Sequence, residues 1–169
     1  MKLLILVLAL LCVGIVKSAI KPPPFGCRPR DPFPYKLGCY RGYVGKQRYL
    51  LNKLLFTDRD PSSRVFSGQT INWRNWKTYV NGLACRCAKA AYNKGYTMFG
   101  LQFYGECWSG PVDIQISRSN LNFAYKAKPA KCVQNYHQKC QRGNPYFACV
   151  GGAGANYLYV ALPAGRIEV

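Results

Sequence analysis

The most regular pattern of hydrophobic positions lies between residues 72 and 95, and it predicts an α-helix. Apolar and small side chains recur there at intervals of three and four residues, which places them on one helical face. These are Trp73, Trp76, Val80, Leu83, Cys87, Ala90 and Ala91. The polar residues toward the opposite side are Arg74, Lys77, Asn81 and Lys89. Asn72 suits the amino-terminal cap and Gly95 the stop, whereas Gly82 and Cys85 weaken the pattern between them.

Shorter apolar runs on both sides of this helix predict strands. The first strand begins at 37–40, a second covers 96–103, and the last covers 156–162. Gly105 turns the chain before 106–108. Residues 49–56 are apolar enough to be buried and 57–63 form a loop, while 109–129 predict a loop with one short strand. One main helix packed on a short antiparallel sheet is a small, disulfide-rich, single-domain α+β fold, which is the fold class that we predict.

The amino-terminal region has the layout of a secretory signal peptide. A basic start at Lys2 precedes an unbroken apolar stretch of 14 residues, 3–16, and residues 16–18 offer a small-residue cleavage site. The stretch is shorter than the roughly 20 apolar residues that a membrane span requires. We therefore expect a signal peptide at 1–18, cleaved after Ser18 or one residue later. The mature protein is then secreted and extracellular, without a transmembrane segment.

Composition divides the remainder of the chain into three parts. Residues 19–35 are rich in proline and predict an extended amino-terminal arm. Residues 36–162 have a globular mix of side chains, and 163–169 form a short carboxyl-terminal tail. Removal of 18 of the 169 residues leaves 151, which suits one domain with a core of its own.

Nine cysteines are present, and Cys12 leaves with the signal peptide. The eight that remain are Cys27, Cys39, Cys85, Cys87, Cys107, Cys132, Cys140 and Cys149. In an oxidising compartment we expect all of them to form disulfides, although the sequence does not choose among the 105 pairings. Cys85 and Cys87 are expected to bond to different partners, because the ring joining them would be strained. Cys27 is expected to tie the arm to the domain.

The chain is strongly basic. Of its 24 Lys and Arg residues, Lys2 and Lys17 belong to the signal peptide, so the mature chain has 22 against 6 acidic residues, a net charge of +16. Such a field favours polyanionic partners. Secretion and the lack of a dense basic run argue against nucleic acid. Sulfated or carboxylated polysaccharides, acidic matrix proteins and anionic membranes remain as partners, unless the charge serves solubility alone.

The segment GYTMFGLQFYGECWSG at residues 95–110 resembles the central motif of the WSC domain, a cysteine-rich extracellular module of fungal wall sensors and animal surface proteins. Residues 38–40, 87–91 and 149–159 stand around it in the order of the family's other motifs, so the likeness covers residues 36–162. It is nearest to a variant of secreted and matrix proteins of marine invertebrates, in which the motif ends in Cys-Trp-Ser-Gly.

Two departures from the family concern cysteines. Ser109 stands where the usual motif has a second cysteine, and Cys27 and Cys85 are additional. The family's disulfide pattern is therefore not carried over to this chain. What the resemblance implies is carbohydrate binding without catalysis.

Tyr104, Glu106 and Trp108 are the candidate ligand-binding residues, at the exposed end of a predicted strand. Sugar recognition needs an aromatic face for the C–H side of the ring and a few polar groups for its hydroxyls. The alternative is that Trp108 packs on a disulfide and Glu106 pairs with an arginine. Trp73 and Trp76 form a second aromatic pair, but their spacing is more typical of a core.

No arrangement of catalytic residues is visible in the sequence. His137 is the single histidine, and the thiols are expected to be oxidised. Asp58 and Asp60 lie in a loop with Arg59, where solvation is the ordinary explanation, and no carboxylate pair flanks a sugar cleft. The spacing of the cysteines and the lone histidine also disfavour structural zinc. We therefore expect a protein that is not an enzyme and has no cofactor and no metal.

These observations predict a secreted, non-catalytic matrix protein, for example of shell, skeleton or byssus (biomineralization), that binds acidic polysaccharide or acidic matrix protein. Its 13 tyrosines, interleaved with Lys and Arg, suit cation–π cohesion, and self-association is left open. The alternative is a cationic defence or venom protein that acts on anionic membranes. That function needs an amphipathic segment free for insertion, whereas the predicted helix uses its apolar face in the core.

Overall fold

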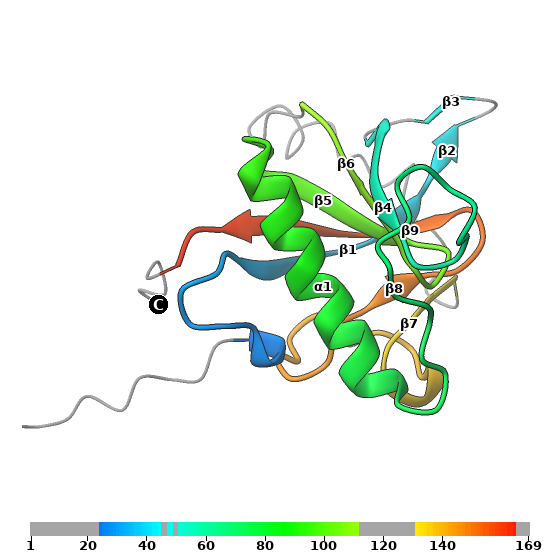
Figure 1. Ribbon diagram of the computed structural model, residues 1–169. Helices are drawn as coiled ribbons and strands as arrows, with labels where there is room; N and C mark the ends of the chain where they lie inside the picture. The colour runs from blue at the N-terminus through cyan, green and yellow to red at the C-terminus, as the bar shows by residue number, and fades with distance from the viewer. Residues whose placement is uncertain (1–23, 45–46, 49–50, 112–130, 165–169) are drawn as a thin grey trace, which may run out of the picture.

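The structure is a computed structural model that describes residues 24–44, 47–48, 51–111 and 131–164. The expected signal peptide, the arm as far as residue 23, most of the predicted loop 109–129 and the end of the tail lie outside the described residues. In the described part, one helix, α1 (Trp76–Asn93), lies across one face of a five-stranded antiparallel sheet (Figure 1). This arrangement confirms the predicted fold class.

The main sheet has the strand order β1-β9-β5-β6-β4. Its strands are β1 (Phe33–Arg41), β4 (Lys53–Thr57), β5 (Met98–Gln102), β6 (Glu106–Ser109) and β9 (Ala155–Leu162). The last strand thus lies between the first strand and the β5–β6 hairpin. Two-stranded pairs are formed by β2 (Tyr43–Val44) with β3 (Gln47–Arg48) and by β7 (Cys132–Val133) with β8 (Val150–Gly151). Short 3-10 turns occur at η1 (Pro24–Gly26) and η4 (Asn135–His137).

Strands β5 and β9 lie within two residues of the positions that the apolar runs predicted, but β1 begins earlier than expected. Phe33, Pro34 and Tyr35, which the sequence assigned to the arm, pair with Leu162, Ala161 and Val160 of β9. β1 is an edge strand, and an edge tolerates proline because one side of the strand needs no hydrogen-bond donor. Proline content alone therefore misplaced the start of the sheet.

The helix begins at Trp76, three residues later than the pattern predicted. The side-chain oxygen Oδ1 of Asn72 accepts a hydrogen bond from the backbone N–H of Asn75 at 2.9 Å, which closes a local turn ahead of the helix. Such side-chain turns compete with helical hydrogen bonding. The prediction that Trp73 lies on the buried helical face is therefore wrong: Trp73 is 53% exposed, whereas Trp76 is 4% exposed.

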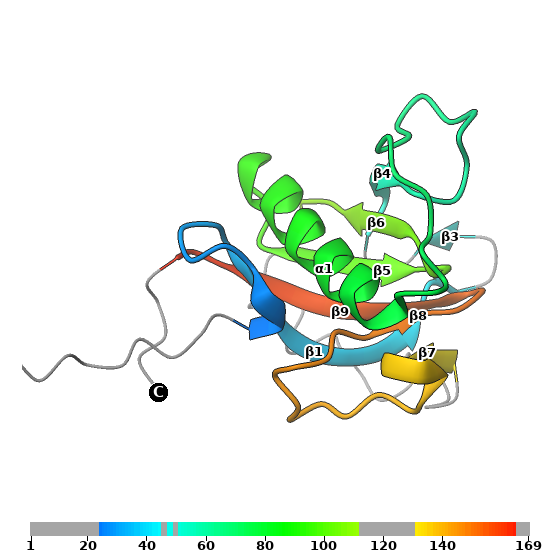
Figure 2. The ribbon, with the colours of Figure 1, turned by 60° about the horizontal axis from the view of Figure 1, so that its bottom comes forward.

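Figure 2 shows α1 on one side of the sheet only. Side chains are nevertheless buried on both faces of the sheet. On the helix side, Val80, Leu83 and Cys87 of α1 pack against alternate residues of the strands. Those strand residues are Phe99, Leu101, Tyr157 and Tyr159. Tyr40, Leu51, Met98 and Leu158 form a second cluster. Leu158 and Met98 alternate with helix-side residues along their strands, so this cluster lies on the opposite face.

All eight expected cysteines are paired. The bonds are Cys27–Cys85, Cys39–Cys132, Cys87–Cys107 and Cys140–Cys149. Cys85 and Cys87 have different partners, as predicted, and Cys27 joins the amino-terminal segment to α1. In the parts of the chain that the structure describes, no helix is both long and apolar enough to cross a membrane.

Asp58, interpreted from the sequence as a solvated loop residue, is 1% exposed. Its carboxylate accepts two hydrogen bonds from the Arg86 guanidinium, at 3.2 and 2.6 Å, one from the Tyr79 hydroxyl at 2.8 Å, and one from the Ser67 hydroxyl. Its backbone N–H donates to the Gly105 carbonyl at 2.8 Å. Asp58 therefore connects the loop after β4 to α1 and to the β5–β6 turn.

Candidate functional site

The three residues predicted to bind a ligand are divided between the two faces of the sheet. Tyr104 packs against the helix-side core, and Trp108 packs against the cluster on the opposite face. The Trp108 indole N–H donates to Glu106 Oε2 at 2.7 Å. Residues two apart in a strand share a face, which explains this pair. From the sequence we expected Glu106 and Trp108 either to bind a sugar or to pack against a disulfide and an arginine. Neither interpretation anticipated the hydrogen bond between these two side chains.

Tyr104 belongs instead to a group of rings at the amino-terminal end of α1, which we call the aromatic cluster: Trp73, Trp76, Tyr104 and His137. The centroids of Trp73 and Trp76 are 5.1 Å apart with planes 2° from parallel, and His137 stacks on Trp76 at 4.8 Å. Tyr104 meets the two tryptophans edge-on at 5.7 and 6.1 Å. Three separate segments of the chain therefore contribute to one surface.

The distances fix how the stacked rings are arranged. Trp73 and His137 have centroids 6.1 Å apart. Stacked rings lie about 3.5 Å from each other, so rings on opposite faces of Trp76 would be roughly 7 Å apart or more. Trp73 and His137 therefore lie side by side over the same face of Trp76.

The two tryptophans have different environments. Trp76 is buried, and its indole N–H donates to the Gln134 carbonyl at 2.9 Å, so its polar atom is satisfied inside the protein. Trp73 stacks on this fixed ring while about half of its surface stays open to solvent. The result is an exposed aromatic face that is held in position by a buried one.

The backbone around the cluster has an unusual conformation. Phe103, Tyr104 and His137 have φ angles of 47°, 67° and 57°, in the left-handed region that non-glycine residues rarely adopt. Each such residue costs of order 1 kcal/mol and persists only where its surroundings hold it. Strain of this kind concentrates at functional sites, and here three instances adjoin one exposed surface.

Identifiable contacts hold the strained turn between β5 and β6. The Tyr104 N–H donates to the Gly151 carbonyl at 3.1 Å. The Arg59 guanidinium lies 3.4 Å from the centre of the Phe103 ring and donates to the Phe103 carbonyl at 3.3 Å. Gly105 is closely surrounded: a Cβ there would lie 3.0 Å from Ile71 and 3.1 Å from the Tyr79 hydroxyl, so these side chains would have to shift to admit it.

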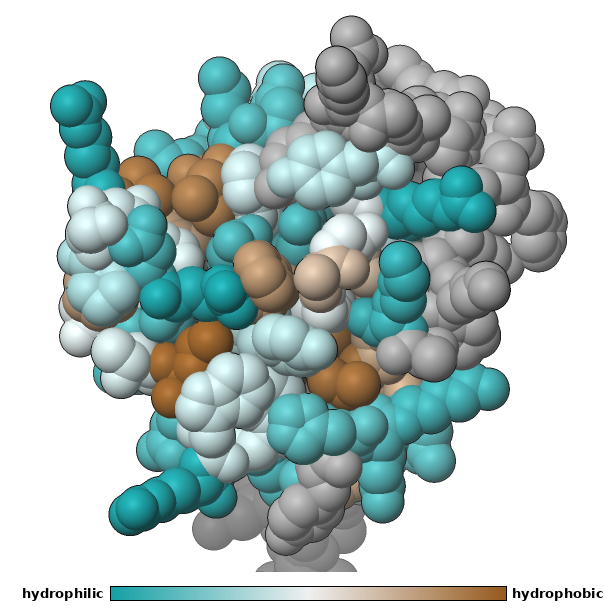
Figure 3. Space-filling model, turned by 90° about the vertical axis from the view of Figure 1, so that its right-hand side faces the viewer, coloured by the Kyte–Doolittle hydropathy of each residue, from teal (hydrophilic) through white to brown (hydrophobic). Residues whose placement is uncertain are grey.

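The side of the molecule that carries the amino-terminal end of α1 has a mixed surface. Figure 3 shows this side, where the apolar patches are small and are separated by intermediate and hydrophilic side chains. No group of three or more His, Cys, Asp or Glu residues that could hold a metal ion occurs among the residues described. The rings of the aromatic cluster offer faces for stacking.

The sequence offered Tyr104 as a candidate and Trp73 and Trp76 as an alternative aromatic pair that was assigned to the core, but it did not connect them with one another or with His137. The local signal that could have placed Trp73 outside the helix was Asn72. Its side chain closes a turn that includes Trp73, and the helix begins after this turn. His137 reaches Trp76 across a separation of 61 residues, and no local pattern indicates that contact.

Comparison of the chain with models of protein families, with curated proteins and with solved structures finds no match in any of the three. The resemblance to the WSC domain thus stays a prediction that rests on the motifs quoted from the sequence.

Proposed function

We propose that this is a secreted, non-catalytic extracellular matrix protein that binds carbohydrate at the aromatic cluster, with acidic polysaccharide as the main ligand and acidic matrix protein as a further partner. The observation that carries the proposal is the exposed indole of Trp73, stacked on buried Trp76. An aromatic face of this kind stacks on the C–H side of a sugar ring. The likeness to the WSC domain, with its implied carbohydrate binding, supports the same function.

The rigidity of the cluster favours binding. Trp73 is already ordered by contacts with Trp76, Tyr104 and His137, so little side-chain entropy is lost when a ligand arrives. The positive charge of the chain adds long-range attraction for sulfated or carboxylated sugars. Four disulfides are typical of proteins that work in an oxidising, extracellular environment.

The alternative function, action on anionic membranes, has less support from the described residues. Val80, Leu83 and Cys87 of α1 are each no more than 1% exposed, so the apolar face of the helix is used in the core. Insertion into a lipid interface needs such a face to be free.

The proposed function is tested by replacing Trp73 with alanine. We expect Trp73→Ala to bind chitotriose, a neutral trisaccharide, and heparin at least tenfold more weakly, since an aromatic contact and its buried area are lost. The measurement is isothermal titration calorimetry with each sugar.

Tyr92→Ala is the matched control, because it removes a ring that is 46% exposed near the other end of the same helix. It should bind both sugars like the wild-type protein. If Trp73→Ala binds both sugars as tightly as wild type, the aromatic cluster is not the site. If the wild-type protein binds neither sugar, the proposed function itself is wrong.

A further inference from the structure

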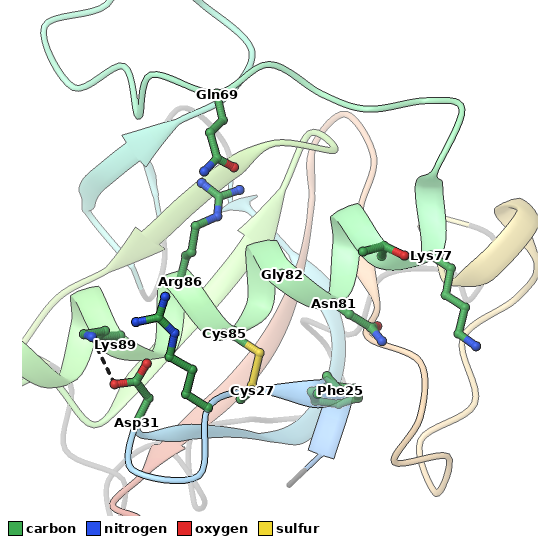
Figure 4. Close-up of a pocket in the computed structure, with 13 residues that line it drawn as sticks. Phe25, Cys27, Asp31, Gln69, Lys77, Asn81, Gly82, Cys85, Arg86 and Lys89 are labelled. Atoms are coloured by element: carbon green, nitrogen blue, oxygen red, sulfur yellow. Dashed lines mark ion pairs between the residues drawn. A yellow bond between two sulfur atoms is a disulfide. The ribbon is translucent and has the colours of Figure 1, made fainter. Parts of the chain in front are cut away.

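A groove runs along the outer face of α1, between the helix and the amino-terminal segment 25–31 (Figure 4). Its volume is about 680 Å³, and the Cys27–Cys85 disulfide joins its two walls. The helical residues that line it follow one another at successive turns, so the groove extends parallel to the helix axis.

The groove is rich in positive charge. Arg28 contributes from the amino-terminal segment, and Lys77, Arg86 and Lys89 contribute from α1, against the single carboxylate of Asp31. Lys89 pairs with Asp31 at 3.0 Å and Arg86 pairs with Asp58 at 2.6 Å. Lys77 lies 4.7 Å from the centre of the Phe147 ring. Over the ranges that the structure covers, Arg28 and Lys77 form no ion pair, so these two charges are available to an anion.

Gly82 lies in the middle of this helical wall, where glycine is a costly choice. Glycine in a helix interior is about 1 kcal/mol less favourable than alanine. Close packing does not require it, because a Cβ built at Gly82 would meet nothing within 4 Å. The absent side chain therefore has one visible effect, which is to leave the wall of the groove bare at its centre.

That bare position connects the groove to a second hollow. A cavity of about 380 Å³ reaches Asn72 and Asn75 and shares four lining residues with the groove: Gln69, Thr78, Gly82 and Arg86. The two hollows thus adjoin at Gly82, and we call them together the track, which extends from Lys89 to Asn72 and Asn75, on either side of the turn that carries Trp73. Along the helix, Trp76 to Lys89 spans roughly 20 Å, which is long enough for several linked sugar rings.

We propose that this track over Gly82 binds a linear polysaccharide that bears sulfate or carboxylate groups, in continuation of the aromatic cluster. The inference rests on the proposed function and specifies its ligand: anionic groups contact Arg28 and Lys77 while a sugar ring stacks on Trp73. Amide and hydroxyl side chains of the track, such as Gln69 and Thr78, suit sugar hydroxyls. An acidic peptide would instead need an exposed strand edge or apolar side-chain pockets along its path.

The test replaces Gly82 with leucine, which fills the track without adding or removing charge. Because leucine is a good helix former and the position is open, Gly82→Leu should be at least as stable as wild type in thermal unfolding. We expect its affinity for a heparin decasaccharide to fall about tenfold. Gly82→Ala, which adds one methyl group, is the matched control and should keep wild-type affinity.

A second pair of variants tests the charges. The double variant Arg28→Gln, Lys77→Gln should reduce the slope of log Kd against log salt concentration for heparin by about two, as two ionic contacts are lost. The double variant Lys53→Gln, Lys94→Gln has the same net charge but changes exposed residues outside the groove. It should leave the slope close to that of wild type.

Chitotriose separates failure of this inference from failure of the proposed function. The trisaccharide is too short to follow the track from Trp73, so Gly82→Leu should bind it like wild type. If Gly82→Leu keeps full affinity for heparin while Trp73→Ala loses it, the track is wrong and the proposed function stands. Polyglutamate with the same number of charges as the heparin tests the assignment to a glycan. If it binds the wild-type protein as tightly as heparin does, that assignment is wrong.

Discussion

The two faces of the sheet use neighbouring aromatic residues of one short segment for different purposes. On the helix side, Tyr104 joins a cluster whose outer ring, Trp73, faces solvent. On the opposite face, Trp108 packs on an apolar cluster and its indole N–H is bonded to Glu106. One surface presents an aromatic face, and the other closes a core. Proximity in the sequence therefore does not indicate a shared role, because the turn and the pleat of the strand separate the side chains.

The largest expected effect tests what supports the helix-side surface. Asp58→Ala leaves Arg86 without its buried partner and removes the bonds that hold Tyr79 and Ser67. Loss of one member of such a network should lower the free energy of unfolding by about 3 kcal/mol, measured by urea denaturation. The carboxylate of Asp58 accepts the hydrogen bond of the Tyr79 hydroxyl, and the Tyr79 ring lies 5.9 Å from that of Trp76, so the indole N–H resonances of the aromatic cluster should shift more than that of Trp108.

Asp60→Ala is the control for this prediction, since Asp60 is an exposed carboxylate two residues away that bonds to Ser62. It should leave the Trp resonances in place. Equal shifts of all three indole signals in Asp58→Ala would mean that the two faces of the sheet are not supported independently.

An intermediate effect is expected on the opposite face. Trp108→Phe retains an aromatic ring but removes the N–H that donates to Glu106, so we expect a loss of about 1 kcal/mol in the free energy of unfolding. Its affinity for chitotriose and heparin should not change. The contrast between the two faces fails if calorimetry shows that Trp108→Phe weakens sugar binding as much as Trp73→Ala does.

An effect of similar size, expected only at alkaline pH, concerns the core behind the aromatic cluster. Burial raises the pKa of Tyr157 to about 12, from about 10 in an unfolded chain. Between these values the unfolded state ionises while the folded state keeps its proton, so stability is lost as the pH rises. From pH 9 to pH 11, wild type should lose about 1 kcal/mol more than Tyr157→Phe in urea denaturation.

Tyr146→Phe, which changes an exposed ring, is the control for the alkaline series. If Tyr157→Phe and wild type show the same pH dependence, the tyrosines of the helix-side core are more accessible to water than their packing indicates.

Elements with a strong local pattern could be predicted from the sequence. The apolar runs located β5 and β9, and the even number of cysteines after the expected signal peptide predicted that all eight would pair. The partner of each cysteine could not be predicted, since Cys39 and Cys132 are 93 positions apart and meet only in the folded chain. Local patterns contain no information about such contacts.

The candidate site was predicted only in part for a similar reason. Tyr104 was identified, but its exposed neighbour Trp73 was assigned to the core because the helical period continues through it. The hydrogen bond that the side chain of Asn72 accepts sets the start of the helix. This single bond overrides the periodic pattern, which continues through residue 73. The burial of Asp58 depends on Arg86, 28 residues away, and the loop sequence gives no sign of it.

The Cys27–Cys85 and Cys87–Cys107 bonds have a mechanical consequence. A force that pulls on the chain ahead of Cys27 passes through sulfur to α1, along residues 85–87, and through sulfur again into β6. Every link in that path is covalent. Tension applied at this end therefore reaches the sheet without first peeling the helix away, and the amino-terminal segment can serve as a tether that keeps its anchorage until a bond is cleaved.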